Sequence, residues 1–347
     1  TGIDNWYATS INTTPATDGV VVRVMEGRAK KIEGNIDHPI NQGKHSSRAE
    51  ATLQSLYNPD RISSPLVRIG PRGSGKWEQI SWTDAIARVS EQISNIDDKS
   101  SILMANNRIS GHAQMILGNF VNSLGCKNLI YEPIESTNLK SSIKHVFNQQ
   151  QIPNFDIKNA KYLISFGADF LENWVSPTKY SRDFGHFRQG SDERGKMIYV
   201  SSRFSMTAAN ADEWIYVNPG TEGHLAMSMA NVIINERLGN KSYAASLTNN
   251  GAFNLSEYEP EKVCKIISPY LTADQIKRLA HEFVEHSPSL AIGGNSVGSH
   301  TNGSDSLSTI YSLNYLVNNI GRKGGVIFQP KPTMPELINN EISGSFS

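Results

Sequence analysis

Five residues that could bind a ligand come directly after three short apolar runs in the middle of the chain. These residues are Gly167, Asp169, Ser202, Arg203 and Glu222. The runs cover residues 162–166, 197–200 and 215–217. Short apolar strands that each lead into a Gly- or Ser-bearing turn and a helix-length segment are typical of parallel βαβ units. Because ligands on such sheets bind beyond the carboxyl ends of the strands, the five residues lie where a nucleotide would bind.

The strands and helices expected around these residues indicate an α/β fold. Beside the three runs, strands are expected at 101–105, 128–131 and 289–292, with helices between them. Residues 239–262, which are rich in Asn and Ser, are expected to be irregular. Before this region, strands at 19–24 and 29–33 and a helix at 47–56 indicate a small β-rich unit. We therefore expect a β-rich unit at 1–62, a Rossmann-like α/β region at 63–328 and a proline-containing tail at 329–347, beyond which the natural protein is expected to continue.

Composition and charge exclude several classes of function. The 347 residues contain 33 Lys and Arg and 33 Asp and Glu, so the net charge is zero. A neutral chain has no electrostatic reason to wrap nucleic acid, so no nucleic-acid partner is expected. No apolar run approaches the roughly 20 residues that a transmembrane helix needs. Residue 1 is Thr, which is consistent with a removed leader or a missing segment.

Other candidate motifs are weak. Cys126 and Cys264 are far apart and cannot by themselves hold a zinc ion or an iron–sulfur cluster. The nine histidines are dispersed and form no HxxxH or HxH pair. The glycine-rich segment at 70–76 lacks the spacing of a Walker loop and favours a plain turn. Ser110-Gly111-His112 could suggest a hydrolase, but no nucleophile-elbow sequence surrounds it.

Three segments carry a resemblance to a known family. GRAKKIEGNIDHPINQGKHSSRAEATLQSLYNPDRISSPL, SRFSMTAANADEWIYVNPGTEGHLA and HTNGSDSLSTIYSLNYLVNNIGRKGGVIF resemble, in this order, segments of the molybdopterin-dependent oxidoreductases of the dimethyl-sulfoxide-reductase superfamily. The resemblance extends from about Gly19 to Phe328. It implies the Rossmann-like parallel-sheet layers of that family, and it implies that residues 1–62 are the remnant of a cluster-binding domain.

The chain departs from the family pattern where cofactors are held. Many members bind a [4Fe–4S] cluster through four N-terminal cysteines, but here that region has none and Ser46 occupies the fourth position. A metal ligand usually follows the second α/β strand. The nearest stretch here, YEPIESTN, offers Glu132, Glu135 and Ser136 without a clear motif. The family's Asp-Pro-Arg is Ser201-Ser202-Arg203 here, and its Pro-Gly-Thr-Asp ends in Glu222. In the family, these two loops help to hold the guanine end of the pterin cofactor. Both changes therefore argue against binding of that cofactor by this chain.

Within the superfamily, FGADFLENWVSPTKYSRDF is most similar to the B subunits of alternative complex III, a bacterial quinol oxidase. This similarity implies a scaffold without catalytic residues, metal or cofactor of its own. The five residues after the strands would then be remnants of a pterin-binding site. The similarity also implies iron–sulfur clusters and haem c in partner parts. The partners would be an iron–sulfur half of the same subunit, multihaem cytochrome c subunits and integral-membrane quinol-oxidising subunits. A twin-arginine signal, absent from these residues, would place the protein on the extracytoplasmic face of the membrane.

The sequence leaves alternatives open for the function of the chain and for the roles of several of these residues. The chain could be an active molybdenum bis-pterin oxidoreductase that lacks the N-terminal cluster, or a soluble nucleotide-binding module. Asp169 could cap the helix after Gly167, and Arg203 could pair with Glu222 or Asp212. Aromatic residues after the central strand could form a subunit interface or pack internally. They are Trp174, Tyr180, Phe184 and Phe187.

Overall fold

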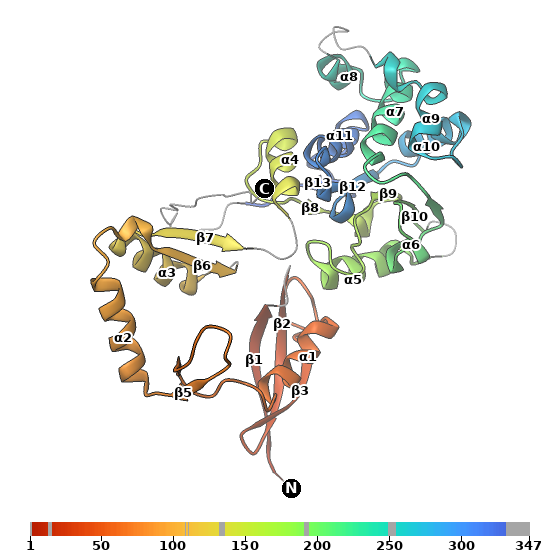
Figure 1. The fold of residues 1–347 in the computed structure, drawn as a ribbon. Coiled ribbons are helices and arrows are strands. Elements are labelled where there is room, and N and C mark those ends of the chain that lie inside the picture. The colour runs from red at the N-terminus through yellow and green to blue at the C-terminus, as the bar shows by residue number, and fades with distance from the viewer. Residues whose placement is uncertain are drawn as a thin grey trace. The chain divides into compact units, whose positions relative to one another are not determined.

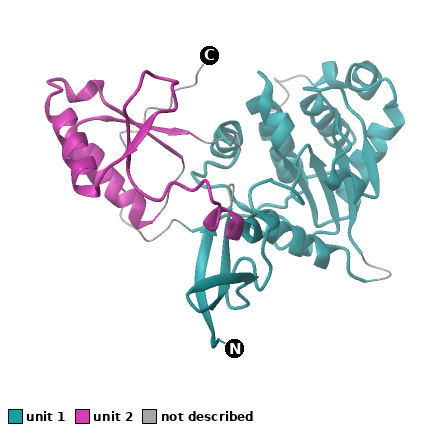
Figure 2. Ribbon diagram, turned by 60° about the horizontal axis from the view of Figure 1, so that its bottom comes forward, with its two compact units in different colours: residues 1–51, 134–331 teal, residues 52–133, 332–347 magenta. Residues whose placement is uncertain are grey.

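The computed structural model divides the chain into two compact units (Figure 2). Unit 1 comprises residues 1–51 and 134–331, and unit 2 comprises residues 52–133 and 332–347. The division at residues 62 and 328, which was inferred from composition, stays a prediction. The structure describes residues 2–12, 16–107, 109, 111–131, 136–190, 194–248 and 255–330.

Unit 1 begins with a three-stranded antiparallel sheet, whose strand order is β1-β2-β3 (Figure 1). Its strands are β1 (Asp4–Asn12), β2 (Thr17–Met25) and β3 (Arg28–Gly34). Strands β2 and β3 cover the two expected runs. Strand β1 was not anticipated, because nearly all of its residues are exposed and its sequence shows no buried face. Helix α1 (Ser47–Leu56) follows at the expected position.

The centre of unit 1 is a parallel sheet with the strand order β11-β10-β9-β12. Its strands are β9 (Tyr162–Phe166), β10 (Lys196–Val200), β11 (Glu213–Ile215) and β12 (Ser289–Gly293). Every residue of β9 and β12 is buried, which explains why these segments are continuously apolar or small rather than alternating. A short antiparallel pair of β8 (Asn154–Phe155) and β13 (Val326–Ile327) completes the strands of unit 1.

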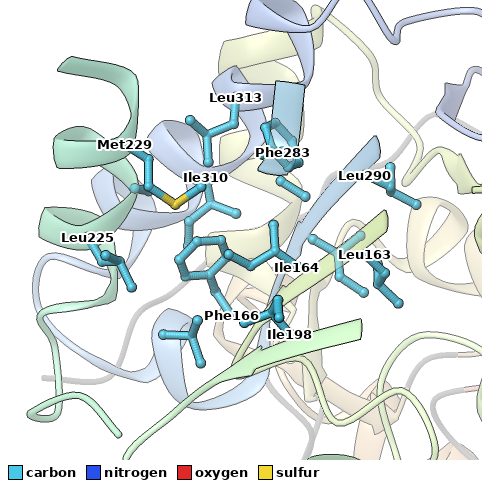
Figure 3. Close-up of a cluster of buried hydrophobic side chains, with 14 of the residues drawn as sticks. Leu163, Ile164, Phe166, Ile198, Leu225, Met229, Phe283, Leu290, Ile310 and Leu313 are labelled. Atoms are coloured by element: carbon cyan, nitrogen blue, oxygen red, sulfur yellow. The ribbon is translucent and has the colours of Figure 1, made fainter. Parts of the chain in front are cut away.

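The helices of unit 1 pack on this sheet or on one another, and the hydrophobic core lies between them and the sheet. They are α4 (Thr137–Phe147), α5 (Pro177–Phe187), α6 (Met206–Ala209), α7 (Glu222–Asn235), α8 (Lys241–Leu247), α9 (Pro260–Ile267), α10 (Ala273–Glu285) and α11 (Gly303–Leu316). Figure 3 shows side chains of α7 and α11 lying beside side chains of the sheet. Among the side chains labelled there are Leu225, Met229, Ile310 and Leu313 from the two helices and Ile164, Phe166 and Ile198 from the sheet. The burial of these side chains holds the strand tips in fixed register.

Unit 2 is smaller and contains two separate two-stranded sheets. Its elements are β4 (Leu66–Arg68), β5 (Trp77–Gln79), α2 (Trp82–Ser94), β6 (Leu103–Asn107), α3 (His112–Leu124) and β7 (Lys127–Tyr131). Strands β4 and β5 form a hairpin around the glycine-rich segment, which is the plain turn expected from the sequence. The Ser81 hydroxyl accepts a hydrogen bond of 3.1 Å from the Asp84 amide and caps α2, also as expected.

The α/β fold class with parallel strands is confirmed. One local prediction is wrong, because residues 241–247 of the segment expected to be irregular form α8. The Asn240 side chain accepts a hydrogen bond of 3.1 Å from the Tyr243 amide. Asparagine is a favourable N-cap, so an Asn-rich sequence here begins a helix rather than preventing one.

Candidate functional site

The candidate site lies at the carboxyl edge of the central sheet. Strands β9, β10 and β11 follow one another across the sheet, and β12 then returns to the free side of β9. This reversal makes the crevice between β9 and β12 the switch point at which parallel α/β sheets bind ligands. The loops after β9 and β12 therefore decide whether a ligand can enter.

The loop after β9 approaches the loop after β12 closely. Gly167 has a φ of 59°, in the left-handed region that favours glycine. A Cβ at this position would come within 2.5 Å of Ser296 Oγ and 3.2 Å of the Gly294 carbonyl oxygen. The glycine is thus required by close packing of the two loops, whatever else it binds.

The indole of Trp174 packs against the loop after β12. A Cβ added to Gly294 would lie 2.0 Å from Trp174 Nε1, so the indole lies directly against the Gly294 backbone. The ring centroid of Trp174 lies 5.3 Å from those of Phe155 and Tyr180. The indole is buried, and Nε1 has no hydrogen-bond partner among the described residues. A buried side chain of the protein itself thus packs against the backbone at the carboxyl end of β12.

Asp169 joins the tips of β9 and β10. Its carboxylate accepts hydrogen bonds from the Tyr199 hydroxyl and, at 2.8 Å, from Arg203 Nη2. Arg203 also lies 3.8 Å from a carboxylate oxygen of Glu172. Burial, together with the nearby Asp169 carboxylate, raises the pKa of Tyr199, so this hydroxyl stays protonated. Ser202 lies half-buried in the loop that carries Arg203.

Two expectations about these residues are wrong. Among the described residues, the Asp169 carboxylate caps no helix. It accepts hydrogen bonds instead from the Tyr199 hydroxyl on β10 and from the Arg203 guanidinium in the loop after β10. Arg203 pairs with Asp169 and Glu172. Asp212 instead pairs with Arg188, with 2.5 Å between Nη1 and Oδ2. No sequence pattern indicates the Asp169–Arg203 pair, because its members lie in the loops after two different strands.

Glu222 is the first residue of α7 and is completely buried. Neither of its carboxylate oxygens has a hydrogen-bond partner among the described residues. Burial raises the pKa of this carboxyl, and the nearby Glu222 and Gly220 amides and His300 oppose the rise. The Asn302 side chain donates a hydrogen bond of 2.9 Å to the Gly220 carbonyl and so ties this loop to the start of α11. Glu222 contacts neither Asp169 nor Arg203 through any hydrogen bond or ion pair found within the described ranges.

Ser46, which the resemblance places at the fourth cluster position, has a structural role. The Ser46 hydroxyl donates a hydrogen bond of 2.6 Å to Asp18 and accepts one of 3.2 Å from the Ala49 amide. Ser46 therefore caps α1 and anchors it to β2. Among the residues that the structure describes, no three His, Cys, Asp or Glu side chains are placed to hold a metal ion. Glu132 and Glu135 lie outside the described residues, and Ser136 directly precedes α4.

The aromatic residues after β9 pack internally. Trp174, Tyr180 and Phe187 are buried, and Phe184 is partly buried against the same core. The sequence places Trp174 in this aromatic cluster, but it does not indicate that the indole contacts the Gly294 backbone. Tyr199 was also missed, because an apolar strand gives no sign of which side chain reaches a neighbouring loop. Within the part of the chain that the structure describes, none of the helices has the length and apolar character needed to cross a membrane.

Comparisons with known proteins agree on one family. The family model described as molybdopterin oxidoreductase matches residues 61–332. The menaquinone reductase, molybdopterin-binding-like subunit, of Nitratidesulfovibrio vulgaris is 26% identical over 326 residues, which cover 94% of this chain and 46% of that protein. The dimethyl sulfoxide reductase DmsA of Escherichia coli is 27% identical over 374 residues, which cover 93% of this chain and 46% of DmsA.

A solved structure has the same fold. Acetylene hydratase from Pelobacter acetylenicus superposes with a TM-score of 0.72 at 22% sequence identity. The superposition covers 89% of this chain and 43% of that one. At this identity the likeness concerns the fold alone. The chain spans less than half the length of these relatives.

Proposed function

The chain belongs to the molybdopterin oxidoreductase family, and from this premise we propose that it is a scaffold without a cofactor of its own. It forms part of the B subunit of a quinol-oxidising complex of the alternative complex III kind. Its task is to hold an iron–sulfur half, multihaem cytochrome c subunits and integral-membrane subunits at distances that permit electron transfer. The complex acts on the extracytoplasmic face of the membrane. The similarity to a relative named a molybdopterin-binding-like subunit of menaquinone reductase supports a quinone-linked role.

The observation that carries this proposal is the close packing at the carboxyl edge of the central sheet. The indole of Trp174 lies against the Gly294 backbone after β12, and Gly167 lies against the same loop. Asp169, which could accept hydrogen bonds from a ligand, already accepts them from Tyr199 and Arg203. A pterin dinucleotide fits this arrangement poorly, because it would have to displace a buried indole and separate a buried carboxylate, Asp169, from the exposed arginine that pairs with it.

The N-terminal sheet supports the same conclusion for an iron–sulfur cluster. Ser46 is engaged in hydrogen bonds to Asp18 and Ala49, so its hydroxyl serves α1. A serine hydroxyl is in any case a poor cluster ligand beside a thiolate. A structural cap in place of a cluster ligand favours a scaffold in which redox centres are carried by partners.

One observation favours a second candidate, the active molybdenum bis-pterin oxidoreductase. Glu222 is a buried carboxylate without a hydrogen-bond partner among the described residues. A buried acceptor of this kind is costly unless a donor reaches it. The guanine end of a pterin dinucleotide would supply N–H donors, and Glu222 would be the residue that holds it.

Metal and pterin analysis of the complex purified from its native membrane distinguishes the two candidates. The proposal expects no molybdenum, no tungsten and no fluorescent pterin after oxidation, in a preparation that retains its iron and haem. A molybdenum or tungsten atom for each copy of the chain would overturn it. Glu222→Gln provides the matched variant, because under the second candidate it lowers the pterin content, whereas under the first it leaves the composition unchanged.

A further inference from the structure

A pocket of about 240 Å³ opens in unit 1 where the end of α7, the start of α8 and the end of α11 meet. Ile234, Ala244 and Leu316, one from each helix, contribute apolar walls. The volume is several times the roughly 30 Å³ of a water molecule but below the roughly 300–1,000 Å³ of pockets for drug-sized ligands. The pocket therefore suits a small organic molecule with an apolar part.

Close packing of the three helices fixes the walls of this pocket. The Asn240 amide donates a hydrogen bond of 2.6 Å to the Leu316 carbonyl, and a Cβ added to Gly239 would collide with the same oxygen. The rings of Tyr243 on α8 and Tyr315 on α11 stack with their centroids 4.4 Å apart. The pocket is therefore formed before any ligand binds.

Two cationic side chains line the pocket without a partner. Arg237 and Lys241 make no ion pair or side-chain hydrogen bond among the described residues, and no acidic residue is part of the lining. Glu236, which precedes Arg237, pairs with His281 on α10 at 2.7 Å. Asn240 uses its Oδ1 atom to cap α8, which leaves its NH₂ group as a further donor. The polar side of the pocket thus offers only positive charge and hydrogen-bond donors.

The carboxyl ends of α7 and α11 do not cancel this charge. The Arg237 amide donates a hydrogen bond of 3.1 Å to the Ile234 carbonyl. The Leu238 amide donates one of 3.0 Å to the Ile233 carbonyl, and the Leu316 carbonyl is also occupied. The end of a helix carries roughly half a negative charge, so two such ends offset only one of the two cations. The pocket remains net positive.

The backbone of Arg237 adopts a conformation that favours glycine. Its φ is 58°, and it follows Glu236, the C-cap of α7, at the position where helices commonly end with a left-handed glycine. A side chain in this conformation has a steric cost that glycine avoids. The turn itself therefore gives no reason for an arginine here, whereas the charge that arginine brings to the pocket does.

We propose that this pocket binds a phosphate ester that carries a short apolar group. Arg237 and Lys241 hold the phosphate oxygens, the Asn240 amide donates a further hydrogen bond, and the apolar group lies against the walls. The pocket is at the opposite end of α7 from Glu222, about 20 Å along the helix axis. The inference therefore does not rest on the role proposed for the carboxyl edge of the sheet.

Equilibrium dialysis of the intact purified assembly with radiolabelled hexyl phosphate tests this inference. We expect saturable binding of one hexyl phosphate for each copy of the chain. Arg237→Gly and Lys241→Gln should each weaken binding roughly tenfold or more, because each removes a charge-assisted hydrogen bond. Lys144→Gln removes an exposed charge from the last turn of α4 and, as the matched control, should leave the affinity unchanged.

The Arg237→Gly variant separates loss of binding from loss of folding. Glycine suits the left-handed conformation, so the variant should melt at the same temperature as the unaltered protein or higher. A variant that binds weakly because it is misfolded would melt at a lower temperature. Lys241→Gln, a change of an exposed side chain, then decides the question.

Competing compounds define the chemistry and the source of the ligand. Inorganic phosphate and hexanol should each displace the label roughly tenfold less effectively than unlabelled hexyl phosphate, because each supplies only part of the contacts. Displacement by phosphatidylglycerol in mixed micelles would identify a lipid headgroup as the source. Displacement by glycerol 3-phosphate would identify a soluble ester, and either result supports the site.

Five results would overturn the inference. They are the absence of saturable binding, an equal loss of affinity in Lys144→Gln, unchanged affinity in both pocket variants, displacement by hexanol as effective as by hexyl phosphate, and displacement by neither natural phosphate ester. None of these measurements involves molybdenum or pterin, so failure here is distinct from failure of the proposed function.

Discussion

The indole of Trp174 lies against the backbone of Gly294, where a Cβ would come within 2.0 Å of Nε1. The contact places a side chain of the loop after β9 against the backbone that follows β12. Gly294 has a φ of 173°, which is extended backbone, so the reason for glycine here is space rather than conformation. The contact between Trp174 and Gly294 thus contributes to the packing of unit 1 at the carboxyl edge of its central sheet.

Gly294→Ala should therefore destabilise the protein by about 1–3 kcal/mol, the usual cost of overpacking a buried site. Trp174→Phe in the same chain should recover part of this loss, because the smaller ring removes the colliding atoms. Urea unfolding of both single variants and the double variant measures the coupling. Gly185→Ala in α5 is the control, since a Cβ there meets nothing within 4 Å. Strict additivity of the two changes would contradict the contact.

Glu222→Gln should change how stability depends on pH. Burial raises the pKa of this carboxyl above its ordinary value of 4.5, so the folded state holds the proton more tightly than the unfolded state. Stability contributed by Glu222 is present below pH 4.5 and is lost as the pH rises through the folded pKa. The Gln variant should be the more stable protein at pH 8, with the difference vanishing towards pH 4. Parallel pH profiles in urea unfolding would show that the carboxylate is solvated.

Glu282→Gln should have the opposite pH dependence. Burial opposes the charged form of Glu282, but Lys196 at 2.9 Å and Arg278 at 3.0 Å outweigh it and hold the pKa below 4.5. This contribution is present above pH 4.5 and is lost as the pH falls through the folded pKa. The variant should lose about 1–3 kcal/mol of unfolding free energy at pH 7. Glu285→Gln, exposed on the same helix, serves as the control and should leave the profile unchanged.

Two substitutions at Ser46 test whether this residue is structural. Ser46→Ala removes the cap of α1 and the hydrogen bond to Asp18, so we expect a loss of about 0.5–2 kcal/mol. Ser46→Cys restores a thiol at the position equivalent to a cluster ligand. It should bind no iron after reconstitution under anaerobic conditions, because the accompanying cysteines are absent. An iron–sulfur absorption band in that variant would show that the region still forms a cluster site.

The amino-acid sequence by itself determined strands β9, β10 and β12 of the central sheet, whereas the run expected at 215–217 shares only Ile215 with β11. Buried parallel strands need continuous apolar residues, and the turns after them need small ones. Local composition is therefore enough to predict the strand at 162–166 and the turn at Gly167. The same local argument failed for β1, which is exposed and has no apolar pattern.

Only the tertiary structure decided what the site residues contact. Asp169 meets Arg203, 34 residues later, because β9 and β10 are neighbours in the order β11-β10-β9-β12. Trp174 meets Gly294 because β12 returns to the other side of β9. Strand order follows from the packing of the whole unit, and no short stretch of sequence encodes it. For that reason the residue types could be read as a nucleotide site, while the fold pairs Asp169 with Arg203 and gives Glu222 no hydrogen bond to either of them among the described residues.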